Sequence, residues 1–173
     1  MSKHRLGRQA AASVALLLLA AGCGGDDGEK ASTPAPAPTT AAAAAQPVQC
    51  ATTDISSAAN KPEYTLTAAL TIEGPTSLKA GANGITVKVS GGQHEFKILK
   101  GNVVSQPRKA NQAIDEAKLT AGALLFKANP SAAGQSCTGL VTLPAGAYTF
   151  VCNVEAGGNS HAGRGQIIDV TVA

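Results

Sequence analysis

The chain has 173 residues and a formal net charge of +3, with 14 Lys and Arg against 11 Asp and Glu. Aromatic residues make up 3% of it, and it contains no cluster of basic residues with aromatic residues between them. Composition therefore gives no support to a nucleic-acid-binding role. The length allows one domain of ordinary size plus additional segments.

Residues 1–22 have the pattern of an export signal. Three basic residues precede the apolar run 10–21, and small residues lead to Cys23. The run is too short to span a bilayer. It resembles a bacterial lipoprotein signal, which implies cleavage before Cys23, lipidation of Cys23, and anchorage to the outer face of a bacterial membrane, either the cell membrane or one facing the periplasm. The alternative is an ordinary secretory signal. Cleavage would leave 11 basic and 11 acidic residues, a formally neutral chain.

Three cysteines remain once Cys23 is assigned to lipid: Cys50, Cys137 and Cys152. In an oxidising compartment, one disulfide and one free thiol is the simplest partition. All three pairings are open at this point. A Cys50–Cys137 disulfide would free Cys152, whereas a Cys137–Cys152 disulfide would free Cys50. An exported free thiol is a liability unless it is buried or binds a metal.

The predicted domain organisation has three parts. Residues 1–22 form the signal, and residues 23–60 form the lipidated cysteine and a linker rich in Ala, Pro and Thr. The part of this linker up to about residue 48 offers no apolar face to bury, which predicts a disordered tether. Residues 61–173 form the folded domain.

Strand-sized runs separated by Gly, Pro and Asn characterise that domain. They are residues 63–73, 84–90, 95–99, 123–128, 140–143, 147–151 and 167–172. Apolar and polar residues alternate clearly in the runs 84–90, 95–99 and 167–172, as expected for strands with one buried face. The segment 111–119 has helical spacing and a capping residue, Asn111, so a short helix is predicted there. About seven short strands in one domain predict an all-β sandwich.

The run from Leu143 to Cys152 carries a thiol at the end of a predicted strand. Tyr148, Phe150 and Cys152 share one face of it, because side chains alternate along a strand. The next loop contains His161 and Gln166.

His94 lies on an earlier predicted strand, on the same face as Phe96 and Ile98, so its ring is expected to point inward. A thiolate and two imidazoles suit copper in both of its redox states, and a rigid sheet would keep such ligands in place.

Residues 61–173 resemble a cupredoxin of the plastocyanin, azurin and halocyanin type. The segments that carry the resemblance are Leu78–Val89, His94–Ile98, Gly134–Ser136 and, above all, Leu143–Cys152. It implies a Greek-key β-sandwich that binds one type 1-like copper ion. The implied ligands are His94, Cys152 and His161. The implied function is single-electron transfer, with a redox protein as partner, or copper carriage.

The sequence departs from that family in two ways. The segment 153–160 makes the loop between Cys152 and His161 long, which is expected to loosen the geometry of the site. The only methionine is Met1, so a methionine axial ligand is absent. Gln166 resembles the glutamine of stellacyanin-like members, and Glu155 is another candidate oxygen ligand.

The candidate ligands could also be present for structural reasons alone, without binding a metal. His94 could be a strand-edge residue, His161 a solvent-exposed loop residue, and Gln166 the first residue of the last strand. The competing hypothesis is therefore a metal-free, cupredoxin-like lipoprotein that acts as a binding or structural module. No phosphate-binding glycine loop and no nucleophile elbow occurs in the sequence, so an enzyme is not predicted.

Overall fold

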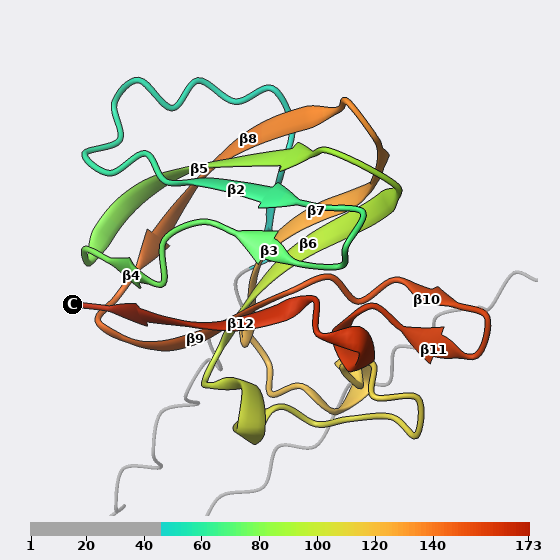
Figure 1. The fold of residues 1–173 in the computed structure, drawn as a ribbon. Helices are drawn as coiled ribbons and strands as arrows, with labels where there is room; N and C mark the ends of the chain where they lie inside the picture. Colours follow the sequence, from blue (N-terminus) through green and yellow to red (C-terminus); the bar gives the residue numbers. More distant parts are fainter. Residues whose placement is uncertain (1–45) are drawn as a thin grey trace, which may run out of the picture. The chain divides into compact units, whose positions relative to one another are not determined.

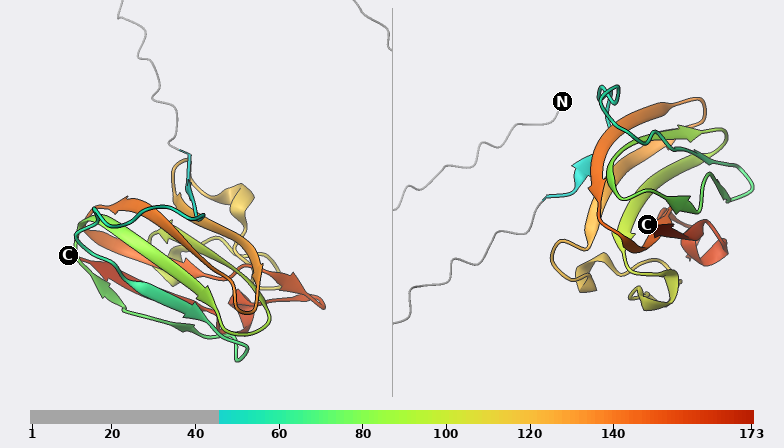
Figure 2. Two further views of the ribbon diagram at one scale, coloured as in Figure 1. Left: turned by 90° about the horizontal axis from the view of Figure 1, so that it is seen from above. Right: turned by 90° about the vertical axis from the view of Figure 1, so that its left-hand side faces the viewer.

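A computed structural model describes residues 46–173 of the chain. The signal segment, Cys23 and most of the predicted tether lie outside the described residues. Residues 46–173 form two β-sheets that face each other, together with a two-stranded ribbon at one end (Figures 1 and 2). The all-β sandwich is confirmed. No helix within the described range is both long enough and apolar enough to cross a membrane.

The larger sheet has six strands in the order β1-β7-β6-β9-β12-β4. Their bounds are Val48–Gln49 (β1), Leu124–Ala132 (β7), Gln93–Lys100 (β6), Gly146–Val151 (β9), Ile167–Val172 (β12) and Ser77–Leu78 (β4). The smaller sheet has four strands in the order β3-β2-β5-β8. Their bounds are Ile72–Glu73 (β3), Glu63–Leu66 (β2), Gly81–Val89 (β5) and Ser136–Leu143 (β8). The ribbon consists of Glu155–Ala156 (β10) and Asn159–Ser160 (β11), and three short 3₁₀ helices span Val103–Ser105 (η1), Glu116–Lys118 (η2) and Ala162–Arg164 (η3).

The core between the sheets is centred on four aromatic rings. Phe96 packs against Tyr64, Phe126 and Phe150, with ring centroids 5.4, 6.2 and 5.5 Å apart. All four side chains are fully buried, and the predicted inward faces of β5, β6, β9 and β12 supply half of the remaining core residues. Alternation along these strands therefore identified their inner faces correctly.

The outer face of β6 is buried as well, contrary to the expectation of one buried face. Glu95 and Lys97 point away from the aromatic core but retain only 8% and 4% of their exposure. A second apolar cluster, formed by Leu99, Ile114, Val151 and Ala162, lies on this outer side. The segments after β6 and β9 fold over the sheet and supply this cover.

The predicted helix over residues 111–119 is wrong, because only the single turn η2 is helical there. Gln112 has a positive φ of 65°. The Asn111 side chain accepts a hydrogen bond from the Ala113 amide (3.1 Å), and the Asn153 side chain accepts one from the Ile114 amide (2.6 Å). Side chains thus bind the backbone groups that a helix would have used.

The predicted strand over residues 63–73 is two strands, β2 and β3, joined by a turn in which Leu70 has a φ of 60°. The larger sheet also begins before residue 61, where the folded domain was predicted to start. Strand β1 pairs in parallel with β7, with Val48 opposite Phe126. A disulfide joins Cys50, just after β1, to Cys137 in β8 and leaves Cys152 as a buried free thiol.

Candidate metal centre

The four candidate ligands come together at one end of the sandwich. His94 is at the start of β6, Cys152 directly follows β9, His161 precedes η3, and Gln166 directly precedes β12. The donor atoms of His94, Cys152 and His161 all lie within 4.8 Å of one another. The Cys152 sulfur lies 3.4 Å from Nδ1 of His161 and 3.8 Å from Nδ1 of His94.

A backbone carbonyl fixes the orientation of the His94 ring. Its Nε2 lies 2.6 Å from the carbonyl oxygen of Gly91, so Nε2 carries the proton and donates it. In the neutral ring Nδ1 therefore keeps its lone pair, and it lies 3.8 Å from the Cys152 sulfur. Metal-binding histidines usually donate their other ring N–H in this way, which fixes the tautomer and directs the free nitrogen at the metal.

Gln166 is equally constrained. Its Nε2 donates a hydrogen bond to the carbonyl oxygen of Thr71 (3.1 Å), so Oε1 is the atom that points inward. That Oε1 lies 2.9 Å from Nδ1 of His94. Two lone-pair donors therefore face each other, and both side chains are fully buried. A cation bound by both atoms satisfies them together, so this arrangement fits a metal site.

Cys152 is fully buried and carries the only thiol of the cluster. Burial raises the pKa of the Cys152 thiol to about 11, while hydrogen bonds from the Val154 and Glu95 amides oppose the rise. The Glu95 amide lies 3.4 Å from the sulfur. A bound metal would replace the proton, because the thiolate is the form that ligates metals.

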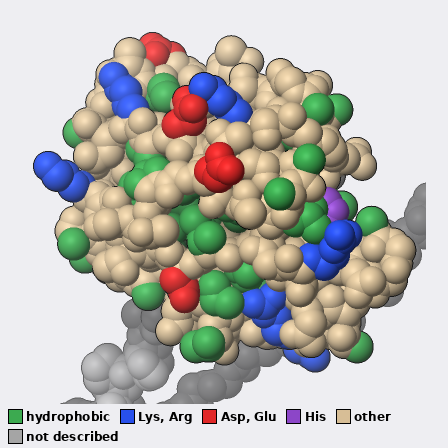
Figure 3. Space-filling view, viewed as in Figure 1, with side chains coloured by type: hydrophobic (Ala, Val, Ile, Leu, Met, Phe, Trp, Pro, Cys, Tyr) green, Lys and Arg blue, Asp and Glu red, His purple; other side chains and the backbone are tan. Residues whose placement is uncertain are grey.

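His161 is the exposed member of the cluster. Figure 3 shows a histidine at the surface among hydrophobic and basic side chains, and His161 is the partly exposed one of the two described histidines. Burial, and then the proximity of His94, lower the pKa of the His161 ring. Both effects favour the neutral form, which offers a lone pair to a metal.

Comparisons with known proteins bear on the fold. No protein-family model matches the chain, and no curated protein matches it. Among solved structures, auracyanin B is similar with a TM-score of 0.50 and 18% identity, over 75% of this chain and 99% of that one. An auracyanin from Roseiflexus castenholzii is similar with a TM-score of 0.50 and 21% identity, over 67% of this chain and 98% of that one. The domain has the cupredoxin fold.

The long loop between Cys152 and His161 is not loose, contrary to expectation. It folds into the β10–β11 ribbon, and both arms are tied to the segment before η2. Glu155 accepts hydrogen bonds from Lys109 and from Asn111, each at 2.6 Å. Ser160 donates a hydrogen bond to the Asn111 carbonyl (2.9 Å). The Glu155 carboxylate is thus engaged away from the cluster, which argues against its candidacy as a ligand.

Sequence reasoning missed the groups that orient the four candidate ligands. Thr71 and Gly91 act through backbone carbonyls, for which no side-chain pattern exists. Glu95 and Asn153 did carry a signal, since each directly follows a candidate ligand in the sequence. The Glu95 side chain bonds to Lys97 and the Asn153 side chain bonds to Glu116, which lies in the segment 111–119 where the predicted helix is wrong.

Proposed function

We propose that this chain is an exported electron-transfer protein that binds one copper ion through His94, Cys152 and His161, with Gln166 as a weaker fourth ligand. Copper would supply the chemistry by alternating between its Cu(I) and Cu(II) states. The donor set supports this assignment, because one thiolate and two imidazoles form the trigonal set of blue-copper sites, whose axial ligand is weak. An amide oxygen is a harder donor than a thioether, so Gln166 would favour Cu(II) and lower the reduction potential.

Burial of the donors is the observation that carries the proposal. His94 is 1% exposed, and Cys152 and Gln166 are 0% exposed. A copper carrier has to pass its ion to another protein's ligands, which requires donors that a partner can reach. A buried and oriented donor set instead retains the ion, and an electron can still leave through the exposed edge of His161. Electron transfer is therefore favoured over copper carriage.

The location of the protein is part of the proposal and rests on the sequence. The signal segment and Cys23 support a lipid anchor on the outer face of a bacterial membrane. There the domain would exchange electrons with another redox protein. Globomycin-sensitive processing and membrane fractionation test the anchor: the wild-type chain should fractionate with membranes, and a Cys23→Ala variant should not. Equal fractionation of both would contradict it.

Copper loading tests the site itself. Cu(II) added to the purified protein should give an intense visible charge-transfer band at one copper per chain, and the Cys152 thiol should no longer be titratable after loading. Cys152→Ser should abolish the band, whereas the double variant Cys50→Ser/Cys137→Ser should keep it. Absence of the band, together with absence of a titratable thiol, would contradict the proposal. Rapid transfer of the loaded copper to a competing chelator would favour carriage instead.

A further inference from the structure

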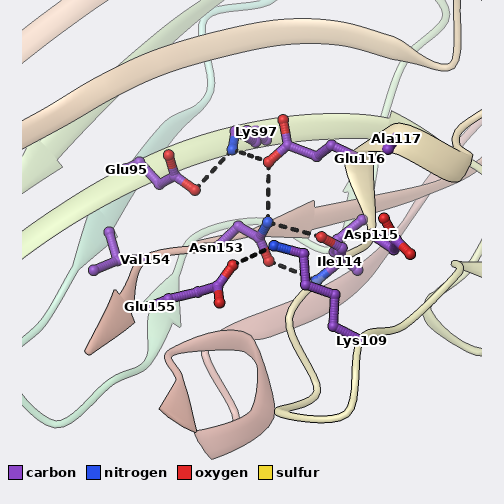
Figure 4. A pocket seen from close by; sticks show the side chains of 10 residues that line it. All are labelled: Glu95, Lys97, Lys109, Ile114, Asp115, Glu116, Ala117, Asn153, Val154 and Glu155. Carbon is purple, nitrogen blue, oxygen red and sulfur yellow. Dashed lines mark hydrogen bonds and ion pairs between the residues drawn. The ribbon is translucent and has the colours of Figure 1, made fainter. Parts of the chain in front are cut away.

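Behind the candidate ligands, on the outer face of β6, three buried polar side chains and the partly exposed Glu116 form a continuous network. Lys97 Nζ lies 2.8 Å from Oε1 of Glu95 and also pairs with Glu116. The Asn153 side-chain amide donates to Oε1 of Glu116 (3.0 Å). These side chains line one wall of a hollow of about 430 Å³, where Figure 4 shows them converging. We call Glu95, Lys97, Glu116 and Asn153 the ionic ring.

The ionic ring connects the two strands that carry the buried ligands. Glu95 directly follows His94, and Asn153 directly follows Cys152. On the inner side of the sheet, the Glu95 amide donates a hydrogen bond to the Cys152 sulfur (3.4 Å), so the two segments are joined a second time. Two links between His94 and Cys152, one through the ring and one through this N–H···S hydrogen bond, thus supplement the backbone pairing of Lys97 with Val151 between β6 and β9.

We propose that the ionic ring is a positioning device that holds the Glu95 amide on the Cys152 sulfur and so tunes the reduction potential of the copper site. The inference rests on the proposed function. Hydrogen bonds to a ligating sulfur are a recognised influence on the potential, because they stabilise the more electron-rich reduced state.

Stability alone does not account for such a ring. Glu95, Lys97 and Asn153 are 8%, 4% and 7% exposed, so their polar groups have lost most of their water. Buried ion pairs often contribute no more to stability than apolar residues of the same volume would, and their best-supported role is to specify one arrangement. Here the arrangement specified is that of the ends of β6 and β9.

Asn153 also binds the backbone of the segment that covers the ring. Its Oδ1 accepts a hydrogen bond from the Ile114 amide (2.6 Å), and its Nδ2 donates to the Ile114 carbonyl (3.1 Å). Asn153 is therefore bound both to Glu116 and to the backbone ahead of η2. Moving Asn153 would shift Cys152 relative to the Glu95 amide.

Two substitutions break the ring at different points, and neither introduces a charge. Asn153→Leu removes the bonds to Glu116 and Ile114, and Lys97→Met removes both ion pairs. Lys88→Met is the matched control, because it removes an exposed ion pair with Glu63 (2.7 Å) in the other sheet. Each variant is loaded with copper, and its reduction potential and visible spectrum are compared with the wild type.

We expect Asn153→Leu to lower the equilibrium constant for reduction about tenfold, which is about 59 mV for one electron, and to change the ratio of the charge-transfer bands. Lys97→Met should change the band ratio in the same direction. The double variant should add little to either single variant, because one break already opens the ring. Lys88→Met should change neither quantity.

A measurement on the metal-free protein separates this inference from the proposed function. In both ring variants, the Glu95 amide should exchange its hydrogen with solvent at least tenfold faster than in the wild type, relative to amides in the centre of β5. If the wild type forms no blue band, the proposed function fails while this test still reports on the ring. If the variants lose stability but keep the wild-type potential, band ratio and Glu95 protection, the ring is only a structural element.

Discussion

Removal of the disulfide should weaken this domain by about 4 to 5 kcal/mol of unfolding free energy. Cys50 and Cys137 are separated by 87 residues in the sequence. A cross-link that closes a loop of that length restricts the unfolded chain, and the chain-entropy relation gives about 4.6 kcal/mol at 25 °C. Cys50 follows a strand of one sheet and Cys137 lies in the other, so the bond also joins the two layers.

Urea unfolding of the Cys50→Ala/Cys137→Ala double variant measures this effect. The midpoint should fall, and the slope of free energy against urea should rise, because the unfolded chain without the cross-link is less compact and exposes more surface. Copper loading should be unchanged, since neither sulfur belongs to the cluster. A loss below about 1 kcal/mol would refute the reasoning, because it would mean that the unfolded chain is already restricted without the cross-link.

Three further outcomes follow from individual residues. Leu70→Gly should raise the unfolding free energy by up to about 1 kcal/mol in thermal or urea unfolding, because a leucine at positive φ is strained and a glycine is not. A lower unfolding free energy in this variant would show that the turn needs the leucine side chain. Gly139→Ala should cost about 1 to 3 kcal/mol in the same assay, since its methyl group would lie 2.5 Å from the Phe126 ring; an unchanged midpoint would contradict the tight packing. In the metal-free protein, the unfolding free energy should fall as the pH rises from 9 to 11, because burial raises the pKa of the Cys152 thiol from 9.0 to about 11 and the unfolded chain loses that proton first. In Cys152→Ala, the unfolding free energy measured in urea should fall less over this pH range. An equal fall in the variant and the wild type would contradict the raised pKa of the Cys152 thiol.

Period-two patterns predicted the inner faces of the strands because alternation fixes which way a side chain points. Phe96 and Phe150 were assigned to the core on this basis, and both are fully buried. The same parity directed His94 and Cys152 inward, and the resemblance to cupredoxins added His161 and Gln166. The structure brings all four together.

The cover over the outer face of β6 could not be predicted in this way. Burial of Lys97 depends on Glu116, which lies 19 positions away in sequence. The helical spacing of residues 111–119 was misleading, because the Asn153 side chain competes for the same backbone groups. Local periodicity contains no information about such distant partners, so both the ionic ring and the tied β10–β11 ribbon emerged only from the structure.

X-ray absorption at the copper edge tests the central claim most directly. On the copper-loaded wild-type protein, the fitted first shell should contain one sulfur and two imidazole nitrogens, and Cys152→Ser should lose the sulfur. Gln166→Leu should leave this set intact while raising the reduction potential. A first shell of nitrogen and oxygen alone in the wild-type protein would contradict the account.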